Sequence, residues 1–496
     1  MGERTVVIVG GGLVGSLSAC YFAKRGWSVI LFEKRPDVRL PENIDLVEHR
    51  SINLAISERG FSALRRLDAD LEKRVKQAVV PMNGRMVHML DGSQMSQAYD
   101  VFGKHINSVG RSALIRLLLD EAETSPGVSL RFCHEFVSAD LDSGAVTIAN
   151  LENKGIATVH ADLIVGADGA HSKVRRQMMP RTMMNYSQTY IEHGYCEFAM
   201  APRDGEFAMD PNHLHIWPRG SFMLIALPNP DKSFTCTLFM PWSRFDAIKT
   251  GDDIVAFFRS NFPDALQLIG EAAVRFEYTA NPKGSLMYLK CTPYTYKGKA
   301  VILGDAAHAM VPFYGQGMNC GFEDVESLDR IMLDVLNRNR AQDDSSNRTV
   351  LLTDDQLATA LGEYSASRTE DASAIVDLAL ENYVEMRAKV VSYTYLLRKH
   401  LEGFLHRMFP RSIIPLYTMV SFTSIPYSTV VRRWQRQTDW IQRSIKAAAI
   451  ALSIGAGVIF IRAMRGNASM AHFITRVARF FSRQTSMAAT TTTTTA

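Results

Sequence analysis

The 496-residue chain reads Thr5-Val6-Val7-Ile8-Val9-Gly10-Gly11-Gly12-Leu13-Val14-Gly15 near its start, and this stretch decides its fold. The β-branched run predicts a buried strand, the glycines predict a tight turn, and the residues after Leu13 predict a helix that stops at Gly26. Residues 28–33 predict a second strand, which ends in the acid Glu33. Strand, glycine turn, helix and strand within about thirty residues form the pattern of a dinucleotide-binding βαβ unit.

Each glycine of the turn has a separate task in such a unit. Gly10 permits the tight turn, Gly12 lets the backbone approach a pyrophosphate, and Gly15 allows close packing of the helix. The helix N-terminus adds free N–H groups and a positive dipole. Glu33 stands where an acid accepts the ribose hydroxyls of an adenosine. This pattern fits FAD and NAD equally well.

Two later motifs place a carboxylate at the end of a buried strand. Residues 162–166 lead into Ala167-Asp168-Gly169, and residues 300–304 lead into Asp305-Ala306-Ala307-His308. Ligands of doubly wound sheets lie beyond the carboxyl ends of the strands. Together with the glycine turn, these three strand ends predict one long cofactor site.

The periodicity of the chain divides it into five segments. Alternating runs with Pro and Asn turns at 185–290 indicate a mainly antiparallel sheet, and a helical period returns at 357–410. His213 and His215 stand two apart on one of these strands, where strand packing is a better interpretation than a metal pair without a third ligand. The predicted segments are a dinucleotide-binding domain at 1–184 with 291–336, a substrate domain at 185–290, a helical region closing the site at 357–443, an anchor at 444–483 and a disordered end at 484–496.

The net charge of +4 averages two unlike regions. Of 55 Lys and Arg residues, ten lie from Arg432 onward together with one of the 51 acids, which leaves 45 basic and 50 acidic residues in 1–431. Such asymmetry indicates a segment that meets a membrane or nucleic acid. No nucleic-acid motif accompanies the basic residues, so we expect no nucleic-acid partner. The six cysteines have no metal spacing and predict reduced, mostly buried thiols.

The basic region contains fifteen residues without a charge, 447–461, between Lys446 and Arg462. As a helix they span roughly 22 Å, against roughly 30 Å for a hydrocarbon core, and snorkelling basic side chains can make up the difference. A buried core helix is the alternative interpretation, but basic residues rarely crowd both ends of one. A second basic amphipathic stretch follows at 472–481. We therefore predict a membrane anchor, typical of the mitochondrial outer membrane, with the rest of the chain facing the cytosol.

The motifs resemble the aromatic-hydroxylase class of FAD monooxygenases. The class marks are the glycine fingerprint with Glu33, the pair Asp168-Gly169, and 304–308 followed by Pro312 and 315–319. More narrowly, the chain resembles the kynurenine 3-monooxygenase family over nearly its whole length. The stretches that carry this resemblance are 51–57, 84–88, 213–219, 312–324, 382–387 and 414–420. The implied fold is α/β, with a Rossmann-like FAD domain, an antiparallel substrate domain and a helical C-terminal segment ending in a membrane anchor.

The resemblance implies a cofactor and a chemistry. NADPH would reduce FAD, O2 would then form a flavin hydroperoxide, and its oxygen would reach the kynurenine ring beside the amino group. That amine already activates the ring, so no catalytic side chain and no metal are expected. If Gly317 and Met318 open a helix, its dipole would face the anionic flavin. The expected cofactor contacts are Gly10, Gly12, Leu13, Val14, Gly15, Glu33, Ala55, Arg111, Asp168, Asp305, Gly317, Met318 and Asn319.

The substrate site follows from the same resemblance. L-kynurenine carries an amino-acid group, so its pocket needs a cation for the carboxylate, an acceptor for the ammonium and apolar walls for the ring. Arg85 and Tyr99 match the family's carboxylate pair, completed by Asn382 and Tyr417. Glu385 lies one helical turn beyond Asn382. The expected substrate contacts are Arg85, Tyr99, Phe313, Gln316, Asn382, Glu385 and Tyr417.

Three alternative functions stay open from the sequence. Another aromatic hydroxylase of the class would keep the flavin motifs and lose the set around Arg85. A membrane-bound epoxidase would need a long apolar cavity. A non-enzymatic carrier built on the dinucleotide fold would bind no flavin, and the presence of Asp168 and Asp305 argues against it.

Overall fold

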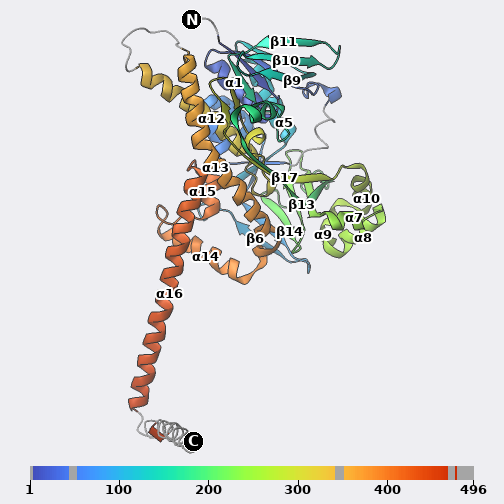
Figure 1. Cartoon of the computed structure of the whole chain (residues 1–496). Coiled ribbons are helices and arrows are strands. Elements are labelled where there is room, and N and C mark those ends of the chain that lie inside the picture. Colours follow the sequence, from blue (N-terminus) through green and yellow to red (C-terminus); the bar gives the residue numbers. More distant parts are fainter. Residues whose placement is uncertain (1–3, 44–52, 341–350, 467–474, 477–496) are drawn as a thin grey trace, which may run out of the picture. The chain divides into compact units, whose positions relative to one another are not determined.

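The computed structural model describes residues 4–43, 53–340, 351–466, 475 and 476 (Figure 1). The chain divides into two compact units, Met1–Val431 and Arg432–Ala496, which we call the body and the tail. The disordered end expected at 484–496 and most of the basic stretch expected at 472–481 lie outside the described residues.

The predicted βαβ unit is present. Strands β1 (Thr5–Val9) and β2 (Ser28–Phe32) are parallel neighbours, and α1 (Leu13–Lys24) connects them. The sheet continues with β12 (Leu163–Gly166), β19 (Ala300–Ile302) and β8 (Val128–Arg131), in the order β18-β19-β12-β1-β2-β8, with β18 (Thr295–Tyr296) antiparallel at one edge. The apolar runs are buried because helices cover a parallel sheet. Since β19, β12 and β1 are adjacent, the three strand ends that carry the motifs lie side by side.

Helices and two small sheets surround this parallel sheet. Helix α1 packs against α5 (Arg111–Thr124) and α12 (Gly317–Arg340), and α12 packs against α3 (Glu58–Leu67). The predicted helix start at Gly317 and Met318 is confirmed. The remaining elements are α4 (Ala69–Gln77), α6 (Lys173–Thr182), α11 (Asp305–His308), the sheet of β3 (Leu54–Ile56), β7 (Ile106–Val109) and β4 (Val80–Met82), and the sheet of β9 (His134–Asp140), β10 (Ala145–Asn150) and β11 (Ile156–His160).

A seven-stranded, mainly antiparallel sheet forms the second part of the body. Its order is β17-β13-β16-β15-β14-β5-β6, and its strands are β17 (Gly284–Thr292), β13 (Asn185–Met200), β16 (Phe234–Pro241), β15 (Met223–Pro228), β14 (His213–Pro218), β5 (Gly84–His88) and β6 (Gln94–Ala98). The sequence placed 84–98 in the first domain, whereas β5 pairs in parallel with β14. This correction has a physical reason: β5 is five residues long and mixes buried polar with apolar side chains, so it lacks the alternation that marks a half-buried strand.

Four helices between β16 and β17 were not predicted. They are α7 (Trp242–Ala247), α8 (Gly251–Asn261), α9 (Pro263–Ile269) and α10 (Glu271–Ala280). Their apolar faces form a core with one side of the sheet, around Phe198, Trp217 and Phe258. The short helices carry too few turns to give a clear helical period in the sequence.

The C-terminal part of the body is helical, as predicted. It contains α13 (Asp354–Ala388), α14 (Tyr393–Met408) and α15 (Leu416–Phe422), and α16 (Tyr427–Gly466) begins in it. The capping box of Thr353 and Gln356 starts α13, each side chain bonding the other's backbone N–H. All six cysteines are free thiols and five are buried, which confirms the expectation for them.

The described part of the tail is mainly the portion of α16 from Arg432 onward. Residues Tyr427–Arg462 are long and apolar enough to cross a membrane, with a mean hydropathy of 2.0 in their most apolar window, and none of that window is buried. Ile450, Leu452, Ile459 and Phe460 are among the exposed apolar side chains. The predicted apolar run 447–461 is therefore part of one continuous helix, and its apolar side chains are exposed.

Candidate active site

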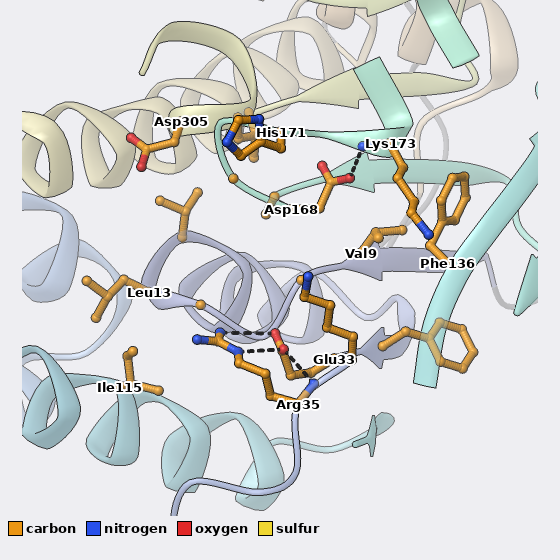
Figure 2. A pocket seen from close by; sticks show the side chains of 18 of the residues that line it. Val9, Leu13, Glu33, Arg35, Ile115, Phe136, Asp168, His171, Lys173 and Asp305 are labelled. Atoms are coloured by element: carbon orange, nitrogen blue, oxygen red, sulfur yellow. Dashed lines mark hydrogen bonds and ion pairs between the residues drawn. The ribbon is translucent and has the colours of Figure 1, made fainter. Parts of the chain in front are cut away.

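A cavity of about 600 Å³ lies at the carboxyl ends of the parallel strands. Figure 2 shows Glu33 and Arg35 on one side of it and Asp168 and Asp305 on the other. The predicted cofactor residues that line it are Gly10, Gly12, Leu13, Val14, Glu33, Arg111, Asp168, Asp305, Gly317 and Met318. The sheet thus brings all three motifs to one cavity.

The three glycines of the turn are required for different reasons. Gly10 has φ +105°, and a Cβ there would come within 2.4 Å of the Ala167 carbonyl oxygen. A Cβ on Gly15 would come within 1.8 Å of the Gly10 carbonyl oxygen. Gly12 has an ordinary φ of −77°, and a Cβ on it would meet nothing within 4 Å. Neither backbone strain nor packing within the protein demands a glycine at position 12, so the predicted reason for it, close approach of a ligand to the backbone, stays a prediction.

The start of α1 faces the same cavity. Gly12 is its N-cap and provides no side-chain cap, so the first N–H groups of the helix are left for a ligand. Their partial positive charge suits a pyrophosphate. The turn, the helix start and the open side of Gly12 together fit the central part of a dinucleotide.

Glu33 is held in place as a carboxylate. One oxygen accepts from the Gly11 N–H at 2.7 Å, and the other accepts from the N–H and Nε of Arg35 at 2.9 and 2.8 Å. Burial opposes its charge, but these hydrogen bonds and the Arg35 guanidinium outweigh burial and hold the pKa of Glu33 below its ordinary value. Glu33 can therefore accept hydrogen bonds from hydroxyl groups.

Asp168 has one oxygen occupied and one open. Its Oδ2 accepts from the Lys173 N–H at 2.6 Å, at the start of α6 (Figure 2). Its Oδ1 is buried, and no described residue donates to it. A buried carboxylate oxygen without a donor is costly, so it marks a place where a ligand would donate a hydrogen bond. The cavity therefore fits FAD, and the individual cofactor contacts stay predictions.

Ala55 and Asn319 do not line the cavity. The Asn319 amide donates to the carbonyls of Ala55 and Gly315, both at 2.8 Å, and its oxygen accepts from the Ser57 N–H at 2.9 Å. Asn319 therefore joins β3 to the turn before α12. In the structure, Asn319 positions the turn before α12, and the start of α12 lines the cavity.

The turn 312–316 connects the cofactor cavity to a second group of predicted residues. Pro312–Tyr314 form one turn of 3₁₀ helix, Gly315 follows with φ +65°, and α12 starts at Gly317. Gly317 and Met318 line the cavity, whereas Phe313 packs between Tyr383 at 3.8 Å and Phe239 at 4.9 Å, measured between ring centroids. The cofactor cavity and the second group of predicted residues are therefore only a few residues apart along this turn.

Arg85 is the centre of the second group. It is buried on β5, and its Nη1 donates to Glu385 Oε1 at 3.1 Å while its Nη2 lies 3.5 Å from Asn382 Oδ1. Burial works against its charge, but Tyr395 and Glu385 nearby outweigh burial and raise the pKa of Arg85. The Asn382 amide donates to the Phe313 carbonyl at 2.7 Å. Helix α13 thereby joins Arg85 to the turn beside the cofactor cavity.

Two tyrosines complete this group. Tyr99 and Tyr417 stack at 4.7 Å, and the Arg85 guanidinium lies 5.7 and 5.3 Å from their ring centroids. Burial raises the pKa of both hydroxyls, so both stay protonated as donors. Arg85 Nε and the Tyr99 hydroxyl are buried without a partner in the part of the chain that the structure describes. Two unpartnered donors beside a buried cation suit a carboxylate.

Sequence reasoning missed residues on α14 that lie beside this group. The Tyr395 hydroxyl donates to Glu385 Oε1 at 2.9 Å, and Lys399 Nζ lies 3.4 Å from Gln97 Oε1. Gln97 on β6 is the cross-strand partner of Arg85. Burial, together with the charge of Arg85, lowers the pKa of Lys399 to about 8. The spacing of Tyr395 and Lys399, four residues apart on a helix, was the signal available.

Gln316 contacts the first residue of α16. The Tyr427 hydroxyl donates to Gln316 Oε1 at 3.1 Å, and the Tyr427 ring covers the buried Arg59 guanidinium at 3.8 Å. Arg59 also donates to the Val420 carbonyl at 2.9 Å and pairs with Glu323. These contacts hold the chain after α15 against the turn that carries Gln316.

Two histidine clusters have structural explanations. His215 is buried, with Nδ1 2.8 Å from Nε2 of His88, and His213 bonds Asp210 at 2.8 Å, so both support the predicted strand packing. His308, Cys320 and Asp324 lie close enough together to hold a metal ion. Arg368 already supplies the positive charge there, since its Nε donates to Asp324 Oδ1 at 2.9 Å. This cluster therefore joins α11, α12 and α13.

The fold and the cavity define an FAD-dependent monooxygenase, and the family model described as FAD binding domain matches residues 3–345. Solved structures share the fold: 2-methyl-3-hydroxypyridine-5-carboxylic acid oxygenase has a TM-score of 0.60 at 20% identity and covers 80% of this chain and 96% of its own. The p-nitrophenol 4-monooxygenase of Pseudomonas putida has a TM-score of 0.59 at 17% identity, with 82% and 94% covered.

Sequence relatives are much more similar. The kynurenine 3-monooxygenase of Candida albicans is 43% identical over 96% of this chain and 98% of its own length. Those of Drosophila willistoni and Sus scrofa are 44% and 40% identical, over 88% and 89% of this chain and 92% and 89% of theirs. The chain therefore belongs to the kynurenine 3-monooxygenase family.

Proposed function

We propose that this chain uses FAD, NADPH and O2 to hydroxylate L-kynurenine to 3-hydroxykynurenine. The observation that carries the proposal is buried Arg85 with two unpartnered donors, joined by Asn382 to the turn at the cofactor cavity. Membership of the kynurenine 3-monooxygenase family supports it. An apolar epoxidase substrate would leave Arg85 Nε and the Tyr99 hydroxyl without a partner, at a cost of about 1–3 kcal/mol for each donor.

The substrate would be held at its amino-acid end and at its aromatic ring. At the amino-acid end, the carboxylate would accept from Arg85 Nε and the Tyr99 hydroxyl, and the ammonium would donate to Glu385. Phe313, stacked on Tyr383, would provide an apolar wall for the ring. Fixing both ends orients the ring toward the turn 312–316, and orientation of this kind is a large part of catalysis.

Glu33, Asp168, Asp305 and the turn Gly10–Gly12 would hold FAD, which when bound supplies the activation of O2 with electrons from NADPH. The aryl amine of kynurenine activates its own ring, so the protein needs no strong base. The start of α12 at Gly317 and Met318 directs N–H groups and a positive dipole into the cavity, which favours negative charge on a bound ligand.

The decisive experiment is NADPH oxidation by the purified yellow protein with identification of the product. Kynurenine should accelerate NADPH oxidation and yield 3-hydroxykynurenine. The decarboxylated analogue of kynurenine, which keeps the ring and the amines, should stimulate far less because it has no partner for Arg85. Equal stimulation by both compounds would contradict recognition of the carboxylate by Arg85. Stimulation without a hydroxylated product would contradict hydroxylation of kynurenine. A colourless protein would favour the non-enzymatic carrier.

We also propose that α16 anchors the chain in the mitochondrial outer membrane with the body facing the cytosol. The exposed apolar helix and its basic flanks support this location. Removing all residues after 440 keeps Tyr427 and should abolish membrane association that resists alkaline extraction. A truncated protein that still resists extraction would place the anchor elsewhere.

A further inference from the structure

Helix α14 exposes an apolar face. Tyr393, Leu397 and Phe404 are 91%, 74% and 62% exposed. At 100° per residue, they share an arc of about 80° with two further exposed apolar residues. We call this set the outer stripe: Tyr393, Leu397, Leu401, Phe404 and Met408.

The opposite face of α14 is polar and packs against the body. Tyr395 bonds Glu385, Lys399 contacts Gln97, and His406 Nδ1 lies 2.6 Å from the Ile413 carbonyl oxygen. A helix on the surface of a water-soluble body normally presents its apolar side to the core and its polar side to water. Helix α14 has the reverse arrangement.

Two further exposed apolar residues lie near α14 but off the outer stripe. Phe409 follows the helix, and Phe102 packs edge-on against His406 on the opposite face, at 5.2 Å. Single exposed apolar residues are common, but five on one face of a helix mark a surface that contacts something else.

The charges beside the stripe favour a lipid surface. Segment 393–411 carries four Lys and Arg residues and one acid, Glu402; Arg398 pairs with Glu402 at 2.7 Å, and Lys399 lies on the opposite face of the helix. Arg407, Arg411 and Lys104 are exposed. An apolar face with aromatic residues and basic flanks is typical of a helix that lies in the plane of an anionic bilayer surface.

We infer that α14 lies in the surface of the bilayer to which the tail anchors the chain. The inference rests on the proposed anchoring, because an anchored body stays at high effective concentration beside lipid, where a stripe of few residues suffices for binding. The buried face of the same helix carries Tyr395 and Lys399 beside Arg85. Lipid contact therefore stabilises one wall of the substrate site.

The test uses the full flavin-containing chain in vesicles of phosphatidylcholine and phosphatidylglycerol. Phe404→Trp places a fluorophore in the outer stripe, and Leu397→Trp places one about two helical turns away on the same face. Phe276→Trp on α10, where Phe276 is 71% exposed, is the matched control. Lipid brominated near its headgroup should quench most of the emission that the first two variants add to the parent, and none of the emission that the control adds.

Each result has one meaning. A chain that sediments with vesicles but shows no added quenching at 404 and 397 overturns the inference and leaves the anchor intact. A blue shift at both positions without quenching also overturns it, because a second copy, another protein or another part of this chain then covers the stripe. A chain that does not sediment with vesicles overturns the anchoring proposal first.

Discussion

The cofactor cavity and the proposed substrate site are built in different ways. The cavity is positioned by neighbouring backbone elements, namely a glycine turn, two helix starts and three adjacent strand ends, and side chains such as Glu33 and Asp168 line it. The substrate site is formed by side chains from β5, α13 and α15, and Arg85 lies 300 residues from its partner Glu385. The cofactor cavity therefore tolerates little change in the main chain. The proposed substrate site depends on the correct packing of elements that are far apart in the sequence.

This difference gives the two sites different failure modes. A residue of the glycine turn can fail by straining the fold or by blocking the ligand, and the structure separates these two effects. A residue of the substrate site should change kynurenine binding and leave FAD in place, because no side chain of the Arg85 group lines the cofactor cavity.

The largest effects are expected at Gly10 and Gly12. Gly10→Ala combines a positive φ with a backbone clash, so we expect a loss of about 3 kcal/mol or more in the free energy of unfolding, together with loss of FAD. Gly12→Ala should also lose FAD, but the flavin-free protein should stay within about 1 kcal/mol of the flavin-free parent. Flavin absorbance and denaturant unfolding measure the two quantities. A Gly12→Ala protein that retains FAD would contradict the role of the open backbone.

Arg85→Met should weaken kynurenine binding by roughly a hundredfold, which corresponds to about 3 kcal/mol for charge-assisted hydrogen bonds. Titration of flavin absorbance measures it, and FAD content should not change. Because Glu385 would lose a buried partner, Arg85→Met with Glu385→Gln is the control for destabilisation. Loss of FAD in both proteins would assign Arg85 to the fold.

The difference between the cofactor cavity and the proposed substrate site also explains which residues could be predicted from the sequence. The cofactor site is local, so the spacing of Gly10, Gly12 and Glu33, and the two acids after strands, located it together with its sheet. Arg85 was identified by resemblance, but its strand was placed in the wrong domain, because strand pairing between β5 and β14 leaves no local signal. Lys399 and Tyr395 were missed for a related reason: their role depends on how α14 packs, which helical periodicity does not determine.

Tyr427→Phe tests whether the chain after α15 positions the turn 312–316. The substitution keeps the ring on Arg59 and removes the hydrogen bond to Gln316, worth about 1 kcal/mol. We expect kcat with kynurenine to fall roughly fivefold with FAD content unchanged. Rapid-reaction measurement of product formation checks it. Tyr427→Leu, which removes the ring as well, should in addition lower the stability of the body, so comparing the two variants separates packing of the ring from positioning by the hydroxyl. An unchanged kcat in Tyr427→Phe would exclude positioning by the hydroxyl.

Lys399→Met should produce the smallest effect on kynurenine affinity, and the size of this effect should depend on pH. With a pKa of about 8, Lys399 is charged at pH 7 and neutral at pH 9. The charge beside Arg85 favours a bound carboxylate, so the parent should lose roughly threefold in kynurenine affinity between these pH values beyond any loss in Lys399→Met. Titrations of flavin absorbance at both pH values measure the difference.

Stability should change in the opposite direction at the same residue. The pKa of Lys399 is below its ordinary value of 10.5, so between pH 8 and 10.5 the unfolded chain binds the proton that the folded chain releases. The parent should therefore gain stability as the pH rises through this window, and Lys399→Met should be the more stable protein at pH 7. If Lys399→Met binds kynurenine more weakly than the parent and is more stable at pH 7, Lys399 promotes substrate binding and destabilises the fold. If the variant loses both affinity and stability, Lys399 is a packing residue.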